Sequence, residues 1–184
     1  MEARVASVKG HRVTLWEKSK ELGGSLKVAV ITPFKEEIEC LIHYLIRQME
    51  ISNVNIQLNK NATAEEVLKE NPDCIIVATG SKQNIPKIKG IENVDVLLPI
   101  DLLTGKVDAG ERVILIGGRL IGADLAEYLN EKGKRVTLLT RQRRIGSDIG
   151  ISTRWVTLMR IRKSKIKVTK EVSCKGDKER RCPY

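Results

Sequence analysis

The sequence predicts an α/β protein built from two units that each contain a parallel sheet. Short aliphatic segments alternate with segments whose apolar residues have helical spacing, and strands separated by helices form parallel sheets. A nine-residue segment, 9–17, recurs as 132–140 with six identical residues, and each copy reads as a helix end, a glycine stop and a β-branched strand. The alternation and the repeat together indicate two similar units in one chain.

The elements of the first unit follow from the positions of its apolar residues. Pro33 is expected in a first helical turn, because its fixed φ suits that position, and an apolar stripe at helical spacing continues from there to Met49. In order, the unit is expected to contain a helix end before Gly10, a strand at 12–16, a helix at 33–49, a half-buried strand at 54–58, a capping box at 63–66 and an apolar strand at 74–78.

The second unit begins with a complete strand–turn–helix pattern. Its elements are expected to be a buried strand at 112–116, a glycine turn at 117–122, a helix at 120–132, a strand at 135–139, a helix at 153–163 and a strand at 165–169. A strand, a glycine turn, a helix and a second strand form half of a dinucleotide-binding fold. Because the two copies are offset by 123 residues, the matching strand and turn of the first unit would precede residue 1.

These patterns predict two Rossmann-like, three-layer dinucleotide-binding units, the first of which lacks its initial strand and glycine loop. We place a partial FAD- or ADP-binding unit at 1–104 and a partial NAD(P)-binding unit at 105–172. Residues 173–184 are expected to be a disordered basic tail, because they contain few apolar residues and have no periodicity.

Composition excludes several other classes of protein. No apolar run approaches the ~20 residues of a membrane helix, and the first residues have no signal pattern, so a cytoplasmic location is expected. The four cysteines form no Cys-x-x-Cys pair, which leaves no ligand set for zinc or an iron–sulfur cluster. The net charge of +10 arises from residues 131–184, yet the scarcity of aromatic residues, 3%, disfavours a nucleic-acid-binding surface.

The segment 13–24 resembles the flavoproteins that bind two dinucleotides, and the segments 33–39, 76–80 and 145–148 narrow the resemblance. Together they are similar to the C-terminal region of the flavoenzymes related to old yellow enzyme, such as 2,4-dienoyl-CoA reductase, 2-enoate reductase and trimethylamine dehydrogenase. The resemblance covers roughly residues 1–170. It implies a C-terminal region that binds FAD, or only ADP, and an inserted NAD(P)-binding domain. It also implies a catalytic barrel domain or partner subunit outside this chain, which would make the chain a fragment.

In the first unit, the resemblance assigns contacts with FAD or ADP to residues at strand ends and glycine turns. Glu17 ends a strand where an acidic side chain accepts hydrogen bonds from a ribose. The alternative is a surface glutamate, and the glycines of this unit could serve only to make turns. The expected contacts are Glu17, Lys18, Gly23, Gly24, Ala78, Thr79 and Gly80.

In the second unit, the glycine turn departs from the dinucleotide-binding fingerprint. Arg119 occupies the position of the second glycine, where a side chain obstructs the approach of a pyrophosphate, so we expect weakened NAD(P) binding. Thr140 stands where Glu17 stands in the first copy, and Arg141 follows, which favours NADP over NAD. The alternative is a solvated basic loop. The expected contacts are Gly117, Gly118, Arg119, Gly122, Thr140 and Arg141.

Three functions remain open from the sequence. The first is a nucleotide-binding module of a flavin-dependent NAD(P)H oxidoreductase, which transfers hydride between nicotinamide and flavin. The second is a non-catalytic remnant or structural module without flavin, and the third is a basic nucleic-acid-binding protein. No catalytic residue is assigned, because His11 and His43 have no partners in the sequence. An exposed sheet edge would favour a homo-oligomer.

Overall fold

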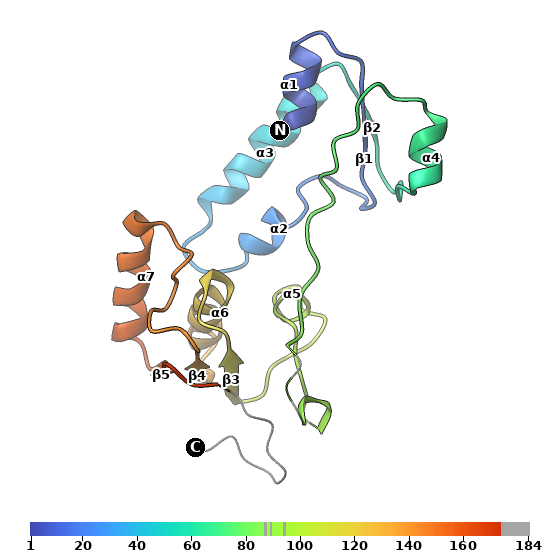
Figure 1. Cartoon of the computed structure of the whole chain (residues 1–184). Coiled ribbons are helices and arrows are strands. Elements are labelled where there is room, and N and C mark those ends of the chain that lie inside the picture. Colours follow the sequence, from blue (N-terminus) through green and yellow to red (C-terminus); the bar gives the residue numbers. More distant parts are fainter. Residues whose placement is uncertain (87, 89, 94, 174–184) are drawn as a thin grey trace. The chain divides into compact units, whose positions relative to one another are not determined.

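The computed structural model describes residues 1–173 apart from 87, 89 and 94 (Figure 1). The chain divides into two compact units, Met1–Lys82 and Gln83–Tyr184. The functional boundary predicted at 104/105 therefore lies within the second compact unit, and it stays a prediction. Except for Ser173, the predicted basic tail lies outside the described residues. None of the described helices is both long and apolar enough to cross a membrane.

The first unit contains a two-stranded parallel sheet. Strand β1 (Val13–Trp16) pairs with β2 (Val54–Gln57) in register from Val13 opposite Val54 to Trp16 opposite Gln57. The connection between them carries α2 and the long helix α3, as a parallel crossover requires. The helices of this unit are α1 (Glu2–Val8), α2 (Leu26–Ala29), α3 (Glu37–Glu50) and α4 (Ala64–Lys69).

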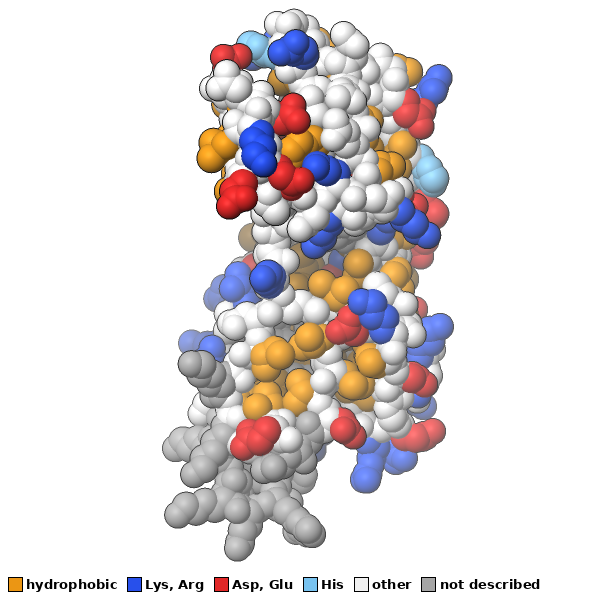
Figure 2. Space-filling view, turned by 90° about the vertical axis from the view of Figure 1, so that its right-hand side faces the viewer, with side chains coloured by type: hydrophobic (Ala, Val, Ile, Leu, Met, Phe, Trp, Pro, Cys, Tyr) orange, Lys and Arg blue, Asp and Glu red, His pale blue; other side chains and the backbone are white. Residues whose placement is uncertain are grey.

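The second unit contains a three-stranded parallel sheet in the order β3-β4-β5. Its core lies between this sheet and α6, where Ala123, Ala126 and Leu138 are fully buried and Leu129 is nearly so. Figure 2 shows that apolar side chains are also exposed on this unit. By its exposed fraction of 55%, Ile114 of β3 is an exposed apolar residue as well. The elements are η1 (Ile91–Asn93), α5 (Pro99–Leu103), β3 (Arg112–Ile116), α6 (Leu120–Glu131), β4 (Arg135–Leu139), α7 (Ile151–Lys163) and β5 (Lys167–Thr169).

The structure confirms the internal repeat. In each copy a glycine of positive φ follows the helix, and two consecutive N–H groups donate back to the last helical turn. The donor–acceptor distances are 2.9 and 3.1 Å for Gly10 and His11, and 3.0 and 3.0 Å for Gly133 and Lys134. This is the pattern of a Schellman cap. The strands that follow, β1 and β4, are equivalent members of two separate parallel sheets, as predicted.

The predicted strand at 74–78 is wrong. These residues form no regular secondary structure, and Ile75, Ile76 and Val77 are 49%, 61% and 77% exposed. Cys74 is exposed as well. A strand persists only when a neighbour pairs with its backbone. Within the described residues the sheet of the first unit consists of β1 and β2, and neither pairs with this segment.

The two predicted helix starts have different outcomes. Thr63 caps α4 as expected, because its hydroxyl accepts a hydrogen bond from the Glu66 N–H at 3.3 Å and donates to the Glu66 carboxylate at 3.0 Å. Pro33 does not lie in the first turn of α3, which begins at Glu37. Phe34 has a φ of 63°, in the left-handed region, and this conformation separates Pro33 from the helix.

Candidate nucleotide-binding sites

The glycine turn of the second unit joins β3 to α6 in the geometry of the fingerprint. Gly117 has a φ of +123°, and its N–H donates to the Leu139 carbonyl of β4 at 2.9 Å. A Cβ added at Gly122 would collide with the Gly117 carbonyl oxygen. Gly117 therefore makes the tight turn and Gly122 allows the close packing of helix on strand, as the outer glycines of the fingerprint do.

Thr140 and Glu17 occupy equivalent positions, as the repeat predicts. The Thr140 N–H donates to the Thr169 carbonyl at 2.9 Å, and the Glu17 N–H donates to the Gln57 carbonyl at 2.9 Å. Each side chain accepts a hydrogen bond from the N–H two residues later, at 3.1 Å for the Thr140 hydroxyl and 2.8 Å for the Glu17 carboxylate. Both side chains thus fix the turn after their strand, and only Glu17 brings a charge to that position.

Position 118 has no room for a side chain larger than that of glycine, because Thr140 packs against it. Thr140 is 3% exposed, and a Cβ added at Gly118 would lie 2.7 Å from the Thr140 Cβ. The two residues therefore set the distance between the glycine turn and the end of β4. In this structure Thr140 is a packing residue, and its predicted role toward a nucleotide ribose stays a prediction.

Asp148 fills the N-terminus of α6, a feature that the sequence analysis missed. One carboxylate oxygen accepts the Leu120 N–H at 2.9 Å, and the other lies 3.2 Å from the Arg119 Nε. The first N–H groups of a helix have no partner within the helix and bind anions. The group that would meet a dinucleotide phosphate is therefore occupied by a carboxylate of the chain itself.

The Arg119 backbone does not require glycine, because its φ of −85° is open to any residue. Its side chain is 68% exposed and that of Asp148 is 28% exposed, so both can move without repacking the core. The obstruction expected at Arg119 thus comes from an exposed side chain that is paired with Asp148. The backbone of the turn itself keeps the shape of a dinucleotide-binding loop.

The loop after β4 holds Asp148 in place. The Gly146 N–H donates to the Gly118 carbonyl at 2.7 Å, and the Arg154 Nε of α7 donates to the Ile145 carbonyl at 3.0 Å. Arg141 is exposed at the start of this loop. The loop therefore lies against the glycine turn, with Arg141 and Asp148 at its two ends.

The residues expected to contact FAD or ADP are only partly arranged. The Glu17 carboxylate is engaged with the Ser19 N–H, and Lys18 and Gly24 are exposed. A Cβ added at Gly23 would lie 2.8 Å from the Lys27 side chain, so this glycine makes room for Lys27. Ala78, Thr79 and Gly80 belong to the exposed segment that forms no strand.

Trp16 and Lys60 form a contact beside Glu17 that the sequence did not suggest. The Lys60 Nζ lies 4.8 Å from the Trp16 ring centroid and 2.8 Å from a Glu66 carboxylate oxygen. The hydrogen bond from Lys60, followed by that from Thr63, lowers the pKa of the Glu66 carboxyl. The Trp16 Nε1 is buried without a hydrogen-bond partner among the described residues. The end of β1 thus carries a free indole donor next to the Glu17 position.

Histidine and the metal-ligating residue types are the remaining candidates among the described residues. His43 is exposed, with its Nε2 4.0 Å from a Glu39 carboxylate oxygen on the same helix. No cluster of three or more His, Cys, Asp or Glu residues that could hold a metal occurs among the residues that the structure describes.

Comparison with known proteins identifies the family. The family model for pyridine nucleotide-disulphide oxidoreductases matches residues 3–181. The chain belongs to this family. Members of the family bind FAD and NAD(P)H, which confirms the cofactor classes expected from the resemblance.

The relatives of this family member are flavin-dependent reductases and oxidases. It is 40% identical over 146 residues to the bilirubin reductase of Mediterraneibacter gnavus, and 38% identical over 154 residues to the NADH oxidase of Thermoanaerobacter brockii. The matches cover 79% and 81% of this chain but 23% and 24% of those proteins. A solved 2-naphthoyl-CoA reductase complex superposes with a TM-score of 0.87 at 37% identity, covering 95% of this chain and 26% of that one. These matches confirm both the resemblance and the α/β dinucleotide-binding fold.

Proposed function

We propose that this chain is the nucleotide-binding module of a flavin-dependent NAD(P)H oxidoreductase. The observation that carries the proposal is the turn between β3 and α6, in which Gly117 and Gly122 keep both conformational roles of the fingerprint. When nicotinamide and flavin are both bound, they supply hydride transfer. The protein residues bind and orient the two nucleotides. The activity and substrate of a longer enzyme would depend on a catalytic barrel domain or partner subunit.

In the second unit, the backbone N–H groups at the start of α6 would hold the pyrophosphate of a nicotinamide dinucleotide. For this to happen, Asp148 has to leave the Leu120 N–H, which it now occupies. Arg141 is exposed beside the β4 end, where an arginine pairs with a 2′-phosphate, and position 140 carries no acidic group to repel one. We therefore infer a preference for NADP over NAD.

In the first unit, we propose that Glu17 accepts hydrogen bonds from the ribose of FAD or ADP, with Lys18, Gly23 and Gly24 beside it. Glu17 ends β1, which is the position that this role requires. Ala78, Thr79 and Gly80 would complete the site. A homo-oligomer and a cytoplasmic location are further parts of this proposal.

A calorimetric titration with NADPH and NADH tests the cofactor assignment. We expect saturable binding of NADPH, weaker binding of NADH, and loss of the difference in Arg141→Ala. Lys170→Ala, another exposed cation of the second unit, is the matched control and should keep the preference. Equal affinities for the two cofactors in the unmodified chain would contradict the preference for NADP.

The second candidate function is a structural module that holds no flavin. The observation in its favour is the ion pair of Arg119 and Asp148, which covers the anion-binding end of α6. The visible absorbance of the purified chain distinguishes the two candidates. A stoichiometric flavin spectrum that persists through dialysis supports the first, and no flavin uptake on addition of FAD together with no NADPH binding supports the second.

A further inference from the structure

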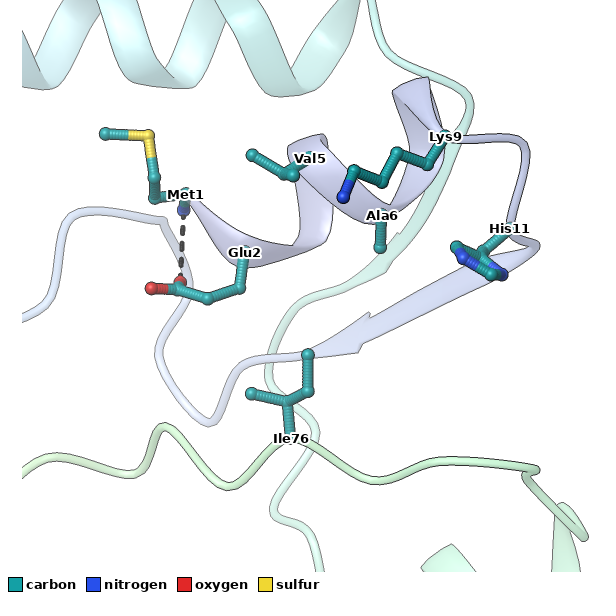
Figure 3. Close-up of a pocket in the computed structure, with 7 residues that line it drawn as sticks. All are labelled: Met1, Glu2, Val5, Ala6, Lys9, His11 and Ile76. Atoms are coloured by element: carbon teal, nitrogen blue, oxygen red, sulfur yellow. Dashed lines mark ion pairs between the residues drawn. The ribbon is translucent and has the colours of Figure 1, made fainter.

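Two features of the described residues have no assigned function. One is a cavity of about 420 Å³ in the first unit, bordered by α1 and Ile76 (Figure 3). Val5, Ala6 and Ile76 supply apolar side chains to its lining, and its charged residues are exposed, so the described lining does not select one class of ligand. The other feature is Arg154 of α7, which connects two parts of the second unit that the proposed nucleotide site uses.

Arg154 reaches from α7 back to the loop that precedes the helix. α7 begins at Ile151, and the Arg154 Nε donates to the Ile145 carbonyl at 3.0 Å. Arg154 is half-buried, and the Ile145 side chain is buried. A cation close to the N-terminus of a helix is disfavoured by the helix dipole, so α7 itself gains no electrostatic stability from arginine at this position. The contact with the loop is therefore the favourable polar contribution of this side chain.

The helix that carries Arg154 is fixed to α6. The Glu127 side chain of α6 is 6% exposed and accepts two hydrogen bonds from Arg160 of α7, at 2.7 and 3.0 Å. Because one partner is buried, this pair resists the motion of one helix against the other. α6 begins at Leu120, whose N–H is the one that Asp148 accepts. The start of α6 and the side chain of Arg154 are therefore held in one frame.

The loop places Asp148 within a closed turn. The Ile149 N–H donates to the Gly146 carbonyl at 3.0 Å, and the Gly146 N–H donates to the Gly118 carbonyl of the glycine turn at 2.7 Å. The turn 146–149 follows directly on the carbonyl that Arg154 holds, and Asp148 is its third residue. Fixing that carbonyl therefore limits where the Asp148 carboxylate can go.

We propose that Arg154 is a positioning residue that keeps Asp148 on the start of α6 and thereby lowers the affinity of the second unit for a nicotinamide dinucleotide. While Arg154 holds the loop, the carboxylate returns to the Leu120 N–H whenever a phosphate leaves it. Without this hydrogen bond the loop samples more conformations, and the carboxylate spends a smaller fraction of the time on the helix. The effect on affinity rests on the proposed function, whereas the effect on Asp148 exists in the chain without nucleotide.

Two neutral variants separate the hydrogen bond of Arg154 from its charge. Arg154→Met removes the donor and keeps an unbranched side chain. Arg154→Gln is the matched control, because its amide nitrogen is bonded to Cδ as the arginine Nε is, so it can donate to the same carbonyl. Both variants lose the positive charge, so a difference between them comes from the hydrogen bond. Arg154→Ala also lacks the donor and repeats the comparison if Arg154→Met does not fold.

Amide exchange at Leu120 in the chain without nucleotide reports the Asp148 contact directly. We expect exchange ~3–10-fold faster in Arg154→Met and unchanged in Arg154→Gln, since one hydrogen bond is lost in the first and kept in the second. Asp148→Ala removes the acceptor itself and sets the upper limit. Leu129 is the internal comparison, because it is buried in α6 and its amide exchanges through larger openings. A purely structural role of Arg154 would speed exchange at Leu129 and leave Leu120 unchanged.

Titration with NADPH tests the consequence for binding. We expect Arg154→Met to raise the affinity ~3–10-fold, and by no more than Asp148→Ala does, because it acts only through that carboxylate. In the Asp148→Ala background, Arg154→Met should have no further effect, as is expected for two residues that act through one contact. A residue that touched the ligand would instead lower the affinity in both backgrounds.

Two results would overturn the proposal. The first is exchange at Leu120 that is the same in Arg154→Met as in the unmodified chain. The second is an equal change in NADPH affinity in the presence and absence of Asp148. Faster exchange at Leu120 with no binding of NADPH by any variant would contradict the proposed function and leave the role of Arg154 toward Asp148 standing.

Discussion

Replacing Asp148 by alanine should tighten the binding of NADPH to the second unit. In the structure the Asp148 carboxylate accepts the Leu120 N–H at 2.9 Å and pairs with the Arg119 Nε at 3.2 Å. A phosphate at the N-terminus of α6 needs the same N–H, so ligand and carboxylate compete for it. Asp148→Ala removes the competitor and its negative charge, while the backbone of the turn stays as it is.

The size of the effect follows from what Asp148 loses when the ligand binds. The Leu120 N–H has a partner with and without ligand, namely the phosphate or Asp148. Binding to the unmodified chain therefore costs only the contacts of Asp148, which are a helix cap, about 1 kcal/mol, and an exposed ion pair, about 0–1 kcal/mol. The sum of about 1–2 kcal/mol corresponds to a ~5–30-fold higher affinity in Asp148→Ala. The same variant loses the cap and the ion pair when no ligand is bound, and its free energy of unfolding should fall by about 1–2 kcal/mol.

Calorimetric titration measures the affinity, and urea unfolding measures the stability. Asp101→Ala is the control, because the Asp101–Lys106 pair has the same 3.2 Å distance and similar exposure, 33% and 68%, away from the glycine turn. We expect Asp101→Ala to leave NADPH affinity unchanged. An affinity in Asp148→Ala equal to or lower than that of the unmodified chain would refute the argument that Asp148 occupies the place of the phosphate.

Three other changes have defined outcomes. Arg119→Gly should raise affinity for NADPH more than for NADH, because it opens the turn and leaves Arg141 beside the 2′-phosphate site. Titration with both cofactors checks this, and weaker binding in the variant would make Arg119 a residue that holds the ligand. Glu127→Ala should lower the free energy of unfolding by about 2 kcal/mol, because the Glu127 side chain is 6% exposed and accepts two hydrogen bonds from Arg160, at 2.7 and 3.0 Å. A change in this free energy below about 0.5 kcal/mol in urea unfolding would argue against the reasoning. The hydrogen bond from Lys60 is the first cause of the lowered pKa of Glu66, so the contribution of Glu66 to stability is complete above the ordinary glutamate pKa and is lost as pH falls through the folded value. The protection factors of the α4 amides, which are exchange rates relative to those of the unfolded chain at the same pH, should fall through this step in the unmodified chain and not in Glu66→Gln.

The parts of the fold that local sequence determines could be predicted. The two Schellman caps depend on a glycine that takes positive φ after a helix, and the repeat places one at Gly10 and one at Gly133. The capping box at Thr63 needs only residues three positions apart. Strands β1 and β4 are β-branched segments next to these caps, and they were predicted for the same reason.

The parts that depend on distant residues could not be predicted. The segment 74–78 has the composition of a buried strand, but a strand forms only with a partner, and composition does not report whether one is present. Asp148 is 28 residues along the chain from Leu120, whose N–H it accepts, and the loop after β4 places its carboxylate at the start of α6. The one sequence feature that could have drawn attention to Asp148 is its acidic side chain within a basic segment. Phe34 shows a third case, in which a left-handed residue detached Pro33 from its expected helix.

The central claim is that a nicotinamide dinucleotide binds at the glycine turn and the start of α6. The most direct test is an amide chemical-shift titration of the ¹⁵N-labelled chain with NADPH. The account predicts saturable shifts of Gly117, Gly118, Leu120 and Arg141, and of the Asp148 loop as its carboxylate leaves the helix. Saturable shifts confined to other residues, or no shift at the glycine turn at ligand concentrations that saturate the Asp148→Ala variant, would contradict it.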